Sequence, residues 1–489
     1  MSKEAIEGLK PEILWQRFYE ISQVPRPSKS EGKVREYLRK VANETNLSFK
    51  EDEVGNIVIS VPATPGYENS PTVVLQGHVD MVCEKNRGTD HDFENDPIIL
   101  VRDGEWLKAR GTTLGSDNGI GVAAALAVMT DKSLVHGPIE CLFTIDEETG
   151  LTGANNLQPG FITGKTLLNL DSEEDGTFYV GCAGGIDTQG TFAVDYSEKV
   201  EGYSTYSIMV SGLKGGHSGS DIDAGRGNAI KLLGRLLKEL DGTGYLLAHI
   251  EGGSKRNAIP REAEAIILLK ESKEKKVLKL IKELGSQFQD EFKVTDGGVK
   301  IEMTKKEPGA NKVFNRKLQK KMADILLGIP HGVVSMSAEI PGLVETSTNL
   351  ATVVTENGSI VIGTSQRSSI ESAKKYIADS VSAVFNLAGA EVLQTDGYPG
   401  WKPDLQSKAL RVSQKIYEVL FNNEPEVKAI HAGLECGILG AKYPGLDMIS
   451  FGPTITGAHS PDERVNIESV EKFYRLLSGI LAEYSTMKG

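Results

Sequence analysis

Cysteine and histidine are both scarce in this chain, and positive charge is in deficit. The sequence has four cysteines in 489 residues, none in a CxxC pair, and eight histidines. Scattered cysteines suit a reducing compartment rather than a disulfide framework, and they leave no thiolate set for a zinc finger. Acidic residues number 67 against 54 basic ones, a formal charge of −13. Nucleic acid is therefore excluded as an expected partner.

Long apolar runs are absent as well. The first residues, MSKEAIEGLKPEILWQRF, carry charge where a signal peptide needs an apolar core, and the small-apolar stretch GIGVAAALAVM is too short to span a bilayer. We therefore expect a cytoplasmic protein without a membrane partner. A chain of 489 residues exceeds what one compact core can hold, so two or more domains are expected.

The first part of the chain alternates helix and strand patterns. In residues 31–44 the side chains of Val34, Leu38 and Val41 share one helical face. Apolar runs typical of buried strands follow at residues 56–61, 72–77, 139–145, 165–170 and 177–181, and residues 117–131 form a small-residue helix between two of them. This order predicts an α/β domain with a mixed, mostly parallel sheet, helices on both faces, and ligands at the carboxyl ends of the strands.

The order of predicted helices and strands changes after GCAGG (181–185). Two successive sets of strand, helix and paired strands follow, and they predict an α+β domain of ferredoxin-like units. Past the Pro/Gly-rich stretch GYPGWKPD (397–404) the first pattern returns. We therefore expect one catalytic domain, residues 1–186 and 399–489, interrupted by an inserted lid domain at residues 187–398. The two units of the lid show no sequence identity, so an internal duplication stays open.

Five stretches near predicted strand ends carry polar groups that are costly to bury unpaired. They are GHVD with His78 and Asp80, TLGSDNGIG with Asp117, TIDEETG with Glu147 and Glu148, LLNLDSEEDG with Asp171, and ITGAHSPDE with His459. Each stretch alone is a weak signal, because a single His or Asp at a strand end is usually structural. Five together in a histidine-poor chain favour a binding site.

The residue types in these stretches predict two divalent metal ions. Imidazole and carboxylate are zinc ligands when thiolates are absent, and cobalt and manganese tolerate the same set. Two ions need one shared carboxylate and private ligands for each, which two histidines and three acidic residues provide. One glutamate is left over: neighbouring Glu147 and Glu148 point in different directions, so one can bind metal while the other acts as a general base. Asp80, two residues from His78, can accept the second imidazole N–H.

The order of these motifs resembles the aminoacylase and carboxypeptidase G family of di-zinc exopeptidases. The resemblance spans essentially the whole chain. Within the family, GHVDMVCEKN, DEETGLTGA, GGHSGSDI, HAGLECG and GPTITGAHSPDERV are most similar to the aminoacyl-histidine dipeptidase branch. Many family members have a lysine after the bridging aspartate; this chain has Asn118 there, which agrees with that branch.

The resemblance implies a role for each polar residue. The implied metal ligands are His78 and Asp171 on one zinc, Glu148 and His459 on the other, and Asp117 bridging both. Glu147 is implied to be the general base, which takes a proton from the bridging water as its hydroxide attacks the scissile carbonyl and then delivers it to the leaving amine. Asp80 is implied to orient the imidazole of His78.

The inserted domain is implied to bind the substrate. His217 in LKGGHSGSDI resembles the lid histidine that stabilises the oxyanion. Asn257 and Arg367 match the groups at the substrate's free carboxylate, although the two residues before the arginine differ from those of many relatives. Glu435 in HAGLECG is placed near the substrate, and His431 of the same motif has no assigned role.

The predicted activity is hydrolysis of a dipeptide enclosed by the closing lid. The resemblance implies Xaa-His substrates, including β-alanyl-histidine, and leaves a broad dipeptide specificity open. The alternatives are a deacylase of N-acyl amino acids and a metal-bearing binding protein without catalysis. The intact Glu147 argues against the second alternative. A homodimer and a monomer whose doubled lid mimics a dimer both stay open.

Overall fold

The structure is a computed structural model that describes residues 2–198 and 201–488. The chain divides into two compact units: unit 1 contains residues 1–181, 401–429 and 434–489, and unit 2 contains residues 182–400 and 430–433. The segment 430–433, which the sequence placed in the catalytic domain, groups with unit 2. The reason is local, since the backbone N–H of Ala183 donates to the carbonyl oxygens of Ile430 and Ala432, both at 3.0 Å.

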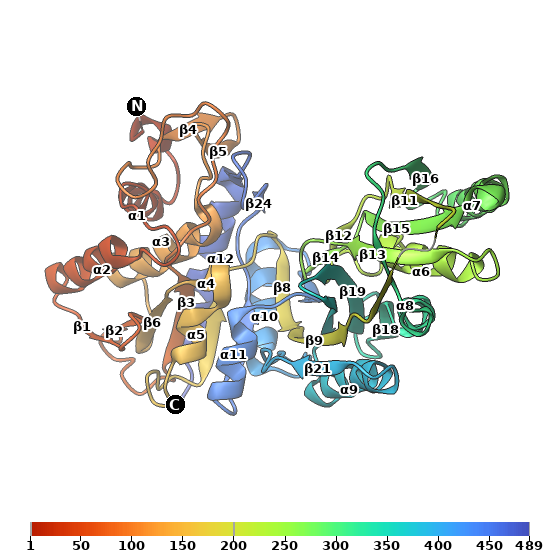
Figure 1. Ribbon diagram of the computed structural model, residues 1–489. Helices are drawn as coiled ribbons and strands as arrows, with labels where there is room; N and C mark the ends of the chain where they lie inside the picture. Colours follow the sequence, from red (N-terminus) through yellow and green to blue (C-terminus); the bar gives the residue numbers. More distant parts are fainter. Residues whose placement is uncertain (1, 199–200, 489) are drawn as a thin grey trace. The chain divides into compact units, whose positions relative to one another are not determined.

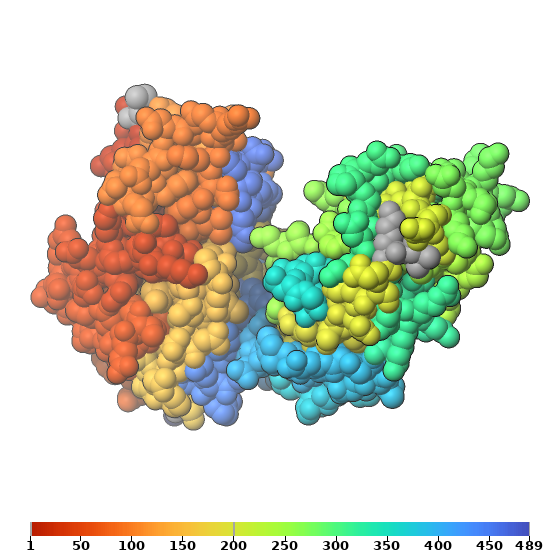
Figure 2. All heavy atoms as spheres, viewed as in Figure 1, coloured from red at the N-terminus to blue at the C-terminus, as the bar shows by residue number. Residues whose placement is uncertain are grey.

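Both ends of the chain build unit 1, as the red and blue segments in Figures 1 and 2 show. Its main sheet has eight strands in the order β1 (Ser48–Glu51), β2 (Ile57–Val61), β6 (Ile139–Thr144), β3 (Val73–His78), β7 (Thr166–Asn169), β23 (Asp447–Ser450), β8 (Thr177–Cys182) and β22 (Glu426–Ile430). The central strands β6, β3, β7 and β23 are parallel, and the flanking pairs β1–β2, β2–β6 and β23–β8 are antiparallel. Parallel pairing therefore occupies the middle of a mixed sheet.

The parallel strands are buried because helices cover the sheet. The helices of unit 1 are α1 (Glu12–Ser22), α2 (Gly32–Glu44), α3 (Ser116–Thr130), α4 (Glu147–Gly150), α5 (Thr152–Asn156), α10 (Lys408–Phe421), α11 (Glu435–Lys442) and α12 (Ile467–Ser485), with a 3-10 turn η1 (Glu4–Ile6). Helix α3 packs closely enough that a Cβ on Gly121 would lie 2.5 Å from the carbonyl oxygen of Leu170. Its small residues thus allow a close approach to the end of β7.

Unit 1 also has a second sheet of four strands, which is connected to two loops near the ends of the main sheet's strands. Its order is β24 (Ile455–Thr456), β25 (Arg464–Asn466), β5 (Trp106–Ala109) and β4 (Leu100–Asp103). The loop between β24 and β25 contains His459, and the chain after β5 leads directly into the turn before α3. Residues more than 340 positions apart are thereby joined in one layer.

Unit 2 is built on one nine-stranded sheet. The path runs β16 (Lys300–Lys305), β11 (Tyr203–Ser211), β15 (Ala263–Lys270), β13 (Leu246–Gly252), β19 (Val344–Glu356), β20 (Ser359–Ser368), β9 (Gly184–Ala193) and β21 (Glu391–Gln394), and β18 (Gly332–Met336) pairs with β19. Two small ribbons pair β10 (Tyr196–Glu198) with β17 (Lys312–Phe314) and β12 (Gly216–His217) with β14 (Ala258–Ile259). The two predicted ferredoxin-like units thus share a single sheet, joined where Gly252 pairs with Val353.

One hydrophobic core lies between this sheet and its helices. The helices are α6 (Ala229–Glu239), α7 (Glu274–Glu291), α8 (Arg316–Gly328) and α9 (Glu371–Leu387), with a 3-10 turn η2 (Glu271–Lys273). All four contribute buried side chains to the same cluster, among them Leu233, Phe288, Met322 and Phe385. Across the described residues, no helix has the length and apolarity that a membrane crossing requires.

Candidate active site

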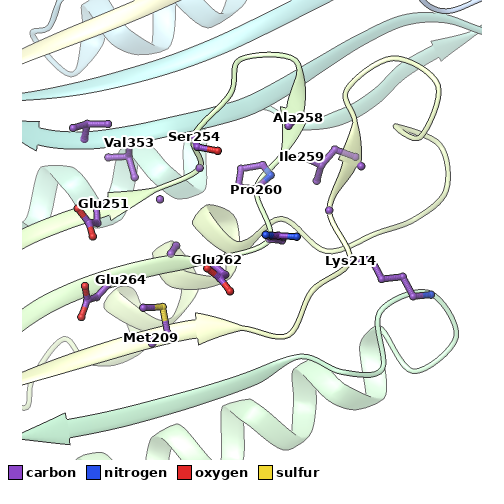
Figure 3. A pocket seen from close by; sticks show the side chains of 17 residues that line it. Met209, Lys214, Glu251, Ser254, Ala258, Ile259, Pro260, Glu262, Glu264 and Val353 are labelled. Atoms are coloured by element: carbon purple, nitrogen blue, oxygen red, sulfur yellow. The ribbon is translucent and has the colours of Figure 1, made fainter. Parts of the chain in front are cut away.

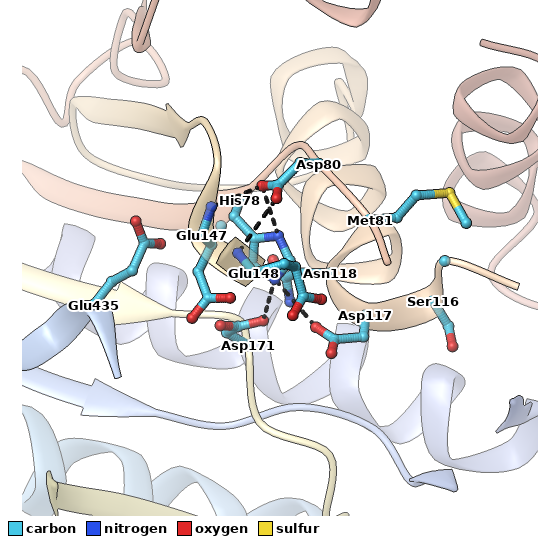
Figure 4. Close-up of polar contacts among 12 residues, drawn as sticks. His78, Asp80, Met81, Ser116, Asp117, Asn118, Glu147, Glu148, Asp171 and Glu435 are labelled. Carbon is cyan, nitrogen blue, oxygen red and sulfur yellow. Dashed lines mark hydrogen bonds and ion pairs between the residues drawn. The ribbon is translucent and has the colours of Figure 1, made fainter. Parts of the chain in front are cut away.

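Four predicted residues lie at the carboxyl ends of the central strands. His78 is the last residue of β3, and Asp171 follows β7 by two residues. Because β3 pairs in parallel with both β6 and β7, the ends of these strands meet at one edge of the sheet. Helix α4 begins directly beyond β6, which places Glu147 and Glu148 at the same edge, as Figure 4 shows.

Two further predicted ligands, Asp117 and His459, lie outside the main sheet. Asp117 lies in the first turn of α3, where its backbone departs from helical geometry (φ −81°, ψ 113°). His459 lies in the loop between β24 and β25 with a left-handed φ of 62°, a conformation that a non-glycine residue adopts at some cost. These two residues cannot be placed together by any local pattern, since 342 positions separate them.

Asp117 lies between two imidazoles. Its Oδ1 is 3.1 Å from Nε2 of His78, and its Oδ2 is 3.1 Å from Nε2 of His459. Oδ1 of Asp171 is 3.3 Å from Nε2 of His78, while Oε2 of Glu148 is 3.0 Å from Nε2 of His459. The five predicted ligands therefore form two groups of three, and Asp117 belongs to both.

This donor set fits divalent metal ions. Within each group the ligand atoms lie within 4.8 Å of one another, and imidazole with carboxylate is the set that zinc, cobalt and manganese accept. Oε1 of Glu148 is buried and has no hydrogen-bond partner in the described part of the chain. An unpaired buried carboxylate oxygen is costly, and a cation held by the same group removes that cost.

Asp80 supports both His78 and the start of α4. Its Oδ1 lies 3.3 Å from Nδ1 of His78, and its two oxygens accept the backbone N–H groups of Glu147 (3.1 Å) and Glu148 (3.3 Å) and the hydroxyl of Ser28 (2.8 Å). Burial acts to raise the pKa of Asp80, but the hydrogen bond and charge of His78 and the N–H of Glu147 outweigh it and lower the pKa to about 2. Asp80 is thus an ionised carboxylate that lies beside the imidazole of His78 and accepts hydrogen bonds from the start of α4.

Glu147 is the carboxylate without a fixed partner. One of its oxygens lies within 4.8 Å of the ligand atoms of His78 and Glu148. No hydrogen bond to its side chain is found among the described residues. Burial, opposed by His78 and reinforced by the negative charges of Asp171, Glu435 and Glu148, raises the pKa of Glu147 well above its ordinary value. A carboxylate with these properties is suited to accept a proton.

Glu435, the first residue of α11, is fully buried beside this group. Its Oε2 accepts hydrogen bonds from Nε2 of Gln76 (2.6 Å) and the hydroxyl of Thr144 (2.8 Å), and Oε1 has no partner in the described part. The amide of Gln76 in turn accepts from Asn169 at 2.5 Å. Burial raises the pKa of Glu435 to about 7 against the opposing charge of His78. The side chain of Glu435 has no exposed surface.

Glu463 is a site residue that sequence reasoning did not assign, although it lies in the quoted SPDE motif. Its carboxylate, 2% exposed, accepts the backbone N–H groups of Leu114 (2.8 Å), Gly115 (3.0 Å), Ser116 (2.7 Å) and Asp117 (3.3 Å) and the Ser116 hydroxyl (2.6 Å). Five donors thus hold the turn that presents the shared ligand. Its position four residues after His459, in the same motif, was the sequence feature that could have indicated this role.

Arg26 is a second unassigned residue, and no motif indicated it. Its buried guanidinium donates from Nη1 to the carbonyl oxygens of Val79 (2.9 Å) and Asp80 (2.8 Å) and from Nη2 to that of Gly115. It therefore ties the loop after His78 to the turn before Asp117.

Asn118, the residue after Asp117, has a structural partner. Its Nδ2 donates to the carbonyl oxygen of Leu170 at 2.7 Å, one residue before Asp171. A Cβ on Gly77 would lie 2.3 Å from its Oδ1, so the glycine before His78 makes room for this side chain. The residue after the shared aspartate thus links three ligand-bearing segments.

Apart from Glu435, which belongs to unit 1, the residues predicted to contact the substrate lie in unit 2. His217 is in β12, and its Nδ1 accepts the backbone N–H groups of Gly219 (3.3 Å) and Ser220 (3.2 Å), which leaves the ring proton on Nε2. Burial and the positive charge of Arg367 lower the pKa of His217. Asn257 is exposed, and its carbonyl oxygen accepts the N–H of Ser218 at 2.9 Å, beside the same loop.

Arg367 is buried in β20 and does not lie on the surface. It is 7% exposed, and its Nη1 donates to the hydroxyl of Tyr398 at 2.8 Å. No carboxylate pairs with it among the described residues. His431 had no predicted role. Its burial, reinforced by the nearby positive charge of Arg367, lowers the pKa of His431 to about 4. Its Nε2 is 2.7 Å from the hydroxyl of Ser347, and its Nδ1 has no partner in the described part.

Unit 2 also contains a cavity of about 530 Å³, drawn in Figure 3. Its lining includes Gly216 and Ala258, the neighbours of two predicted residues, together with Glu251, Glu262 and Glu264. None of the predicted site residues lines it, and the described residues around it form no metal-ligating group of three. The groups that could hold a metal ion lie instead in the carboxylate and imidazole cluster of unit 1.

An α/β fold with a shared carboxylate between two ligand groups, and a free glutamate beside them, defines a metal-dependent hydrolase. A family model described as Peptidase family M20/M25/M40 matches residues 74–483. The chain belongs to this peptidase family.

Two relatives match nearly end to end. The cytosol non-specific dipeptidase of Escherichia coli (strain K12) is 43% identical over 492 residues, covering 98% of this chain and 99% of that protein. The crystal structure of aminoacylhistidine dipeptidase from Vibrio alginolyticus is 42% identical, covers 99% of both chains and superposes with a TM-score of 0.90. A tripeptidase from Staphylococcus aureus, 16% identical with a TM-score of 0.57 over 98% of this chain and 100% of that one, shares the fold.

These comparisons confirm the predicted family and fold class. The chain is a hydrolase, a dipeptidase of a metallopeptidase family. The cofactor class is divalent metal, for which the described residues provide the two ligand groups.

Proposed function

We propose that the chain hydrolyses dipeptides with two divalent metal ions, most simply zinc, held in the cluster of unit 1. The main support for this proposal is that two groups of three potential ligands share the carboxylate of Asp117. His78 and Asp171 would hold one ion, Glu148 and His459 the other, and Asp117 both. Cobalt and manganese suit the same ligands.

The chemistry divides between the metal and the protein. Bound metal supplies a Lewis acid and lowers the pKa of a water molecule. Glu147 accepts a proton from the attacking water and delivers it to the leaving amine, a role for which its unpaired, buried carboxylate is suited. Asp80 keeps the ring of His78 oriented through Nδ1.

For the residues of unit 2 we propose substrate recognition. His217, with its proton on Nε2, donates to the developing oxyanion. Arg367 binds the free carboxylate of the dipeptide, since a buried guanidinium without a carboxylate partner among the described residues is stabilised by an anion. Asn257 contributes an amide to the same end of the substrate.

For Glu435 the proposal is electrostatic rather than a direct contact. The carboxylate is fully buried, and its charge acts on Glu147. A protonated Glu435 therefore makes Glu147 a weaker base, and an ionised one makes it stronger.

Substrate class and location follow the relatives' names. The name of the Vibrio protein supports Xaa-His dipeptides, and that of the Escherichia coli protein supports broader specificity and a cytosolic location. Among Xaa-His dipeptides we propose β-alanyl-histidine as one substrate. We propose a small peptide as the sole substrate type and a homodimer as the assembly. Size measurement in solution tests the assembly.

The test is Glu147→Gln beside Glu36→Gln, an exposed glutamate of the same unit as control. We expect two metal ions per chain in all three proteins. Loss of a general base lowers kcat by about 10²–10⁴-fold, roughly 3–5 kcal/mol, in Glu147→Gln only. Unchanged turnover would reject the base, and failure to retain metal would reject the cluster. Faster hydrolysis of N-acetyl amino acids than of dipeptides would favour a deacylase.

A further inference from the structure

The guanidinium of Arg367 is held on one side only. On β20 it stands opposite Ser347 of β19 and Gly185 of β9. Its Nη1 donates to the Tyr398 hydroxyl at 2.8 Å, whereas its buried Nε has no partner in the described part. No hydrogen bond from Nη2 is found among the described residues either. The Nε–Nη2 edge is therefore the side of the fork that can pair with both oxygens of a carboxylate.

Tyr398 is itself held rigidly at the main chain. Its backbone exchanges hydrogen bonds with Gly185, N–H to O at 2.9 Å and O to N–H at 3.1 Å. The carbonyl oxygen of Tyr398 also accepts from Nζ of the buried Lys374 at 2.6 Å. Tyr398 thus forms an isolated antiparallel β-bridge with Gly185, the second residue of β9.

Two glycines make room for the Tyr398 ring. A Cβ on Gly185 would lie 2.6 Å from ring atom Cε1, and one on Gly433 would lie 2.9 Å from Cε2. Contacts that short are excluded, so a side chain at either position would displace the ring. The position of the hydroxyl is consequently set by packing from both sides and by the main-chain bonds.

We infer that Tyr398 is the positioning residue that fixes the fork of Arg367 for the carboxylate of the dipeptide. The inference rests on the proposed carboxylate role of Arg367. With Nη1 bound to Tyr398, rotation of the guanidinium about its terminal bonds is restricted, and the free edge keeps one orientation. Arginine otherwise loses side-chain entropy when it orders on a substrate, so preorganisation strengthens binding.

The test uses the metal-loaded full-length enzyme with Tyr398→Phe, which keeps the ring and removes the hydroxyl. A dipeptide and the same dipeptide with a C-terminal amide are compared, by KM for the first and by Ki of the second as a competitor. We expect KM for the dipeptide to rise about tenfold or more, as for the loss of a hydrogen bond to a charged group, with kcat within about twofold. The Ki of the amide should not change.

The matched control is Tyr245→Phe. Tyr245 is also buried in unit 2, and its hydroxyl donates to the carbonyl oxygen of Leu237 at 3.1 Å. We expect this variant to leave both KM and Ki at their wild-type values. Arg367→Lys removes the fork, and in that background we expect Tyr398→Phe to have no further effect.

The outcomes separate the two claims. If Arg367→Lys leaves the preference for the free carboxylate unchanged, the proposed role of Arg367 fails and this inference with it. If Arg367→Lys abolishes the preference but Tyr398→Phe does not reduce it, the inference alone is overturned. An equal loss for dipeptide and amide in Tyr398→Phe also overturns it, because a general structural defect would act on both.

Discussion

Replacing Glu463 by glutamine tests how the shared ligand Asp117 is held. The glutamine side chain has the same shape, but only one of its two terminal atoms can accept a hydrogen bond. If the amide oxygen keeps the three donors on Oε1, which come from Ser116 and Asp117, then the N–H groups of Leu114 and Gly115 face an NH₂ group. Glu463→Gln therefore leaves two buried donors unpaired.

The cost follows from those two donors. A buried N–H without an acceptor costs about 1–3 kcal/mol, so two cost about 2–6 kcal/mol. Burial raises the pKa of Glu463, and relief of that desolvation in the neutral amide offsets part of the loss. We expect a net destabilisation of about 2–4 kcal/mol, which in a unit of this size corresponds to a melting temperature lower by about 4–8 °C.

The assay is thermal unfolding of the metal-free protein combined with metal competition against a chelator. Because the distorted turn carries Asp117, we expect metal affinity to fall about tenfold or more. Glu140→Gln is the matched control: this buried carboxylate accepts the N–H groups of Thr163 (2.7 Å) and Gly164 (2.9 Å), in a loop without a predicted ligand. Both N–H groups bond Oε2, so the amide oxygen can keep them, and the Thr163 hydroxyl on the other side can accept from the NH₂ group. Glu140→Gln should therefore keep both its stability and its metal. A Glu463→Gln variant with wild-type melting and metal affinity would refute the reasoning.

Three more predictions follow from single residues. Arg26→Met removes donors to the carbonyl oxygens of Val79, Asp80 and Gly115, so metal should dissociate faster, as a chelator assay measures; an unchanged rate would contradict this. Gly219→Ala sets a Cβ 2.2 Å from the carbonyl oxygen of His431, so kcat/KM should fall about tenfold or more with metal content unchanged. Burial lowers the pKa of His431 to about 4 against about 6.5 in the unfolded chain, so stability present above pH 6.5 is lost, by up to about 3 kcal/mol, as pH falls toward 4. Melting curves of His431→Gln over that range should lack this loss, and a slope equal to that of wild type would disprove it.

Elements with a strong local pattern were predicted well. The buried strands that end at His78 and before Asp171 are continuous apolar runs, and helix α2 has its apolar face at regular spacing. The long strand β9 was missed. Its sequence, GGIDTQGTFA, mixes glycine and polar residues and becomes a strand because β20 and β21 pair with it on either side.

In the candidate site, too, some residues were predicted from local sequence patterns and others were not. Its ligands were visible because each lies at a strand end or in a glycine-rich turn that the sequence displays. Glu463, Arg26 and Tyr398 were not assigned, since each acts through bonds to main-chain or side-chain groups far away in the chain. The burial of Arg367 was not visible in the sequence either.

Residue types and their local spacing are enough to show which strands are apolar enough to be buried, and which imidazoles and carboxylates follow them. This information is local, because side-chain type and spacing act within a few residues. Tertiary structure alone decided that His459 and His78 meet across one aspartate, that residues 430–433 join unit 2, and which edge of Arg367 is free. Those outcomes depend on hydrogen bonds and packing between distant segments, and such contacts leave no periodic trace in the chain.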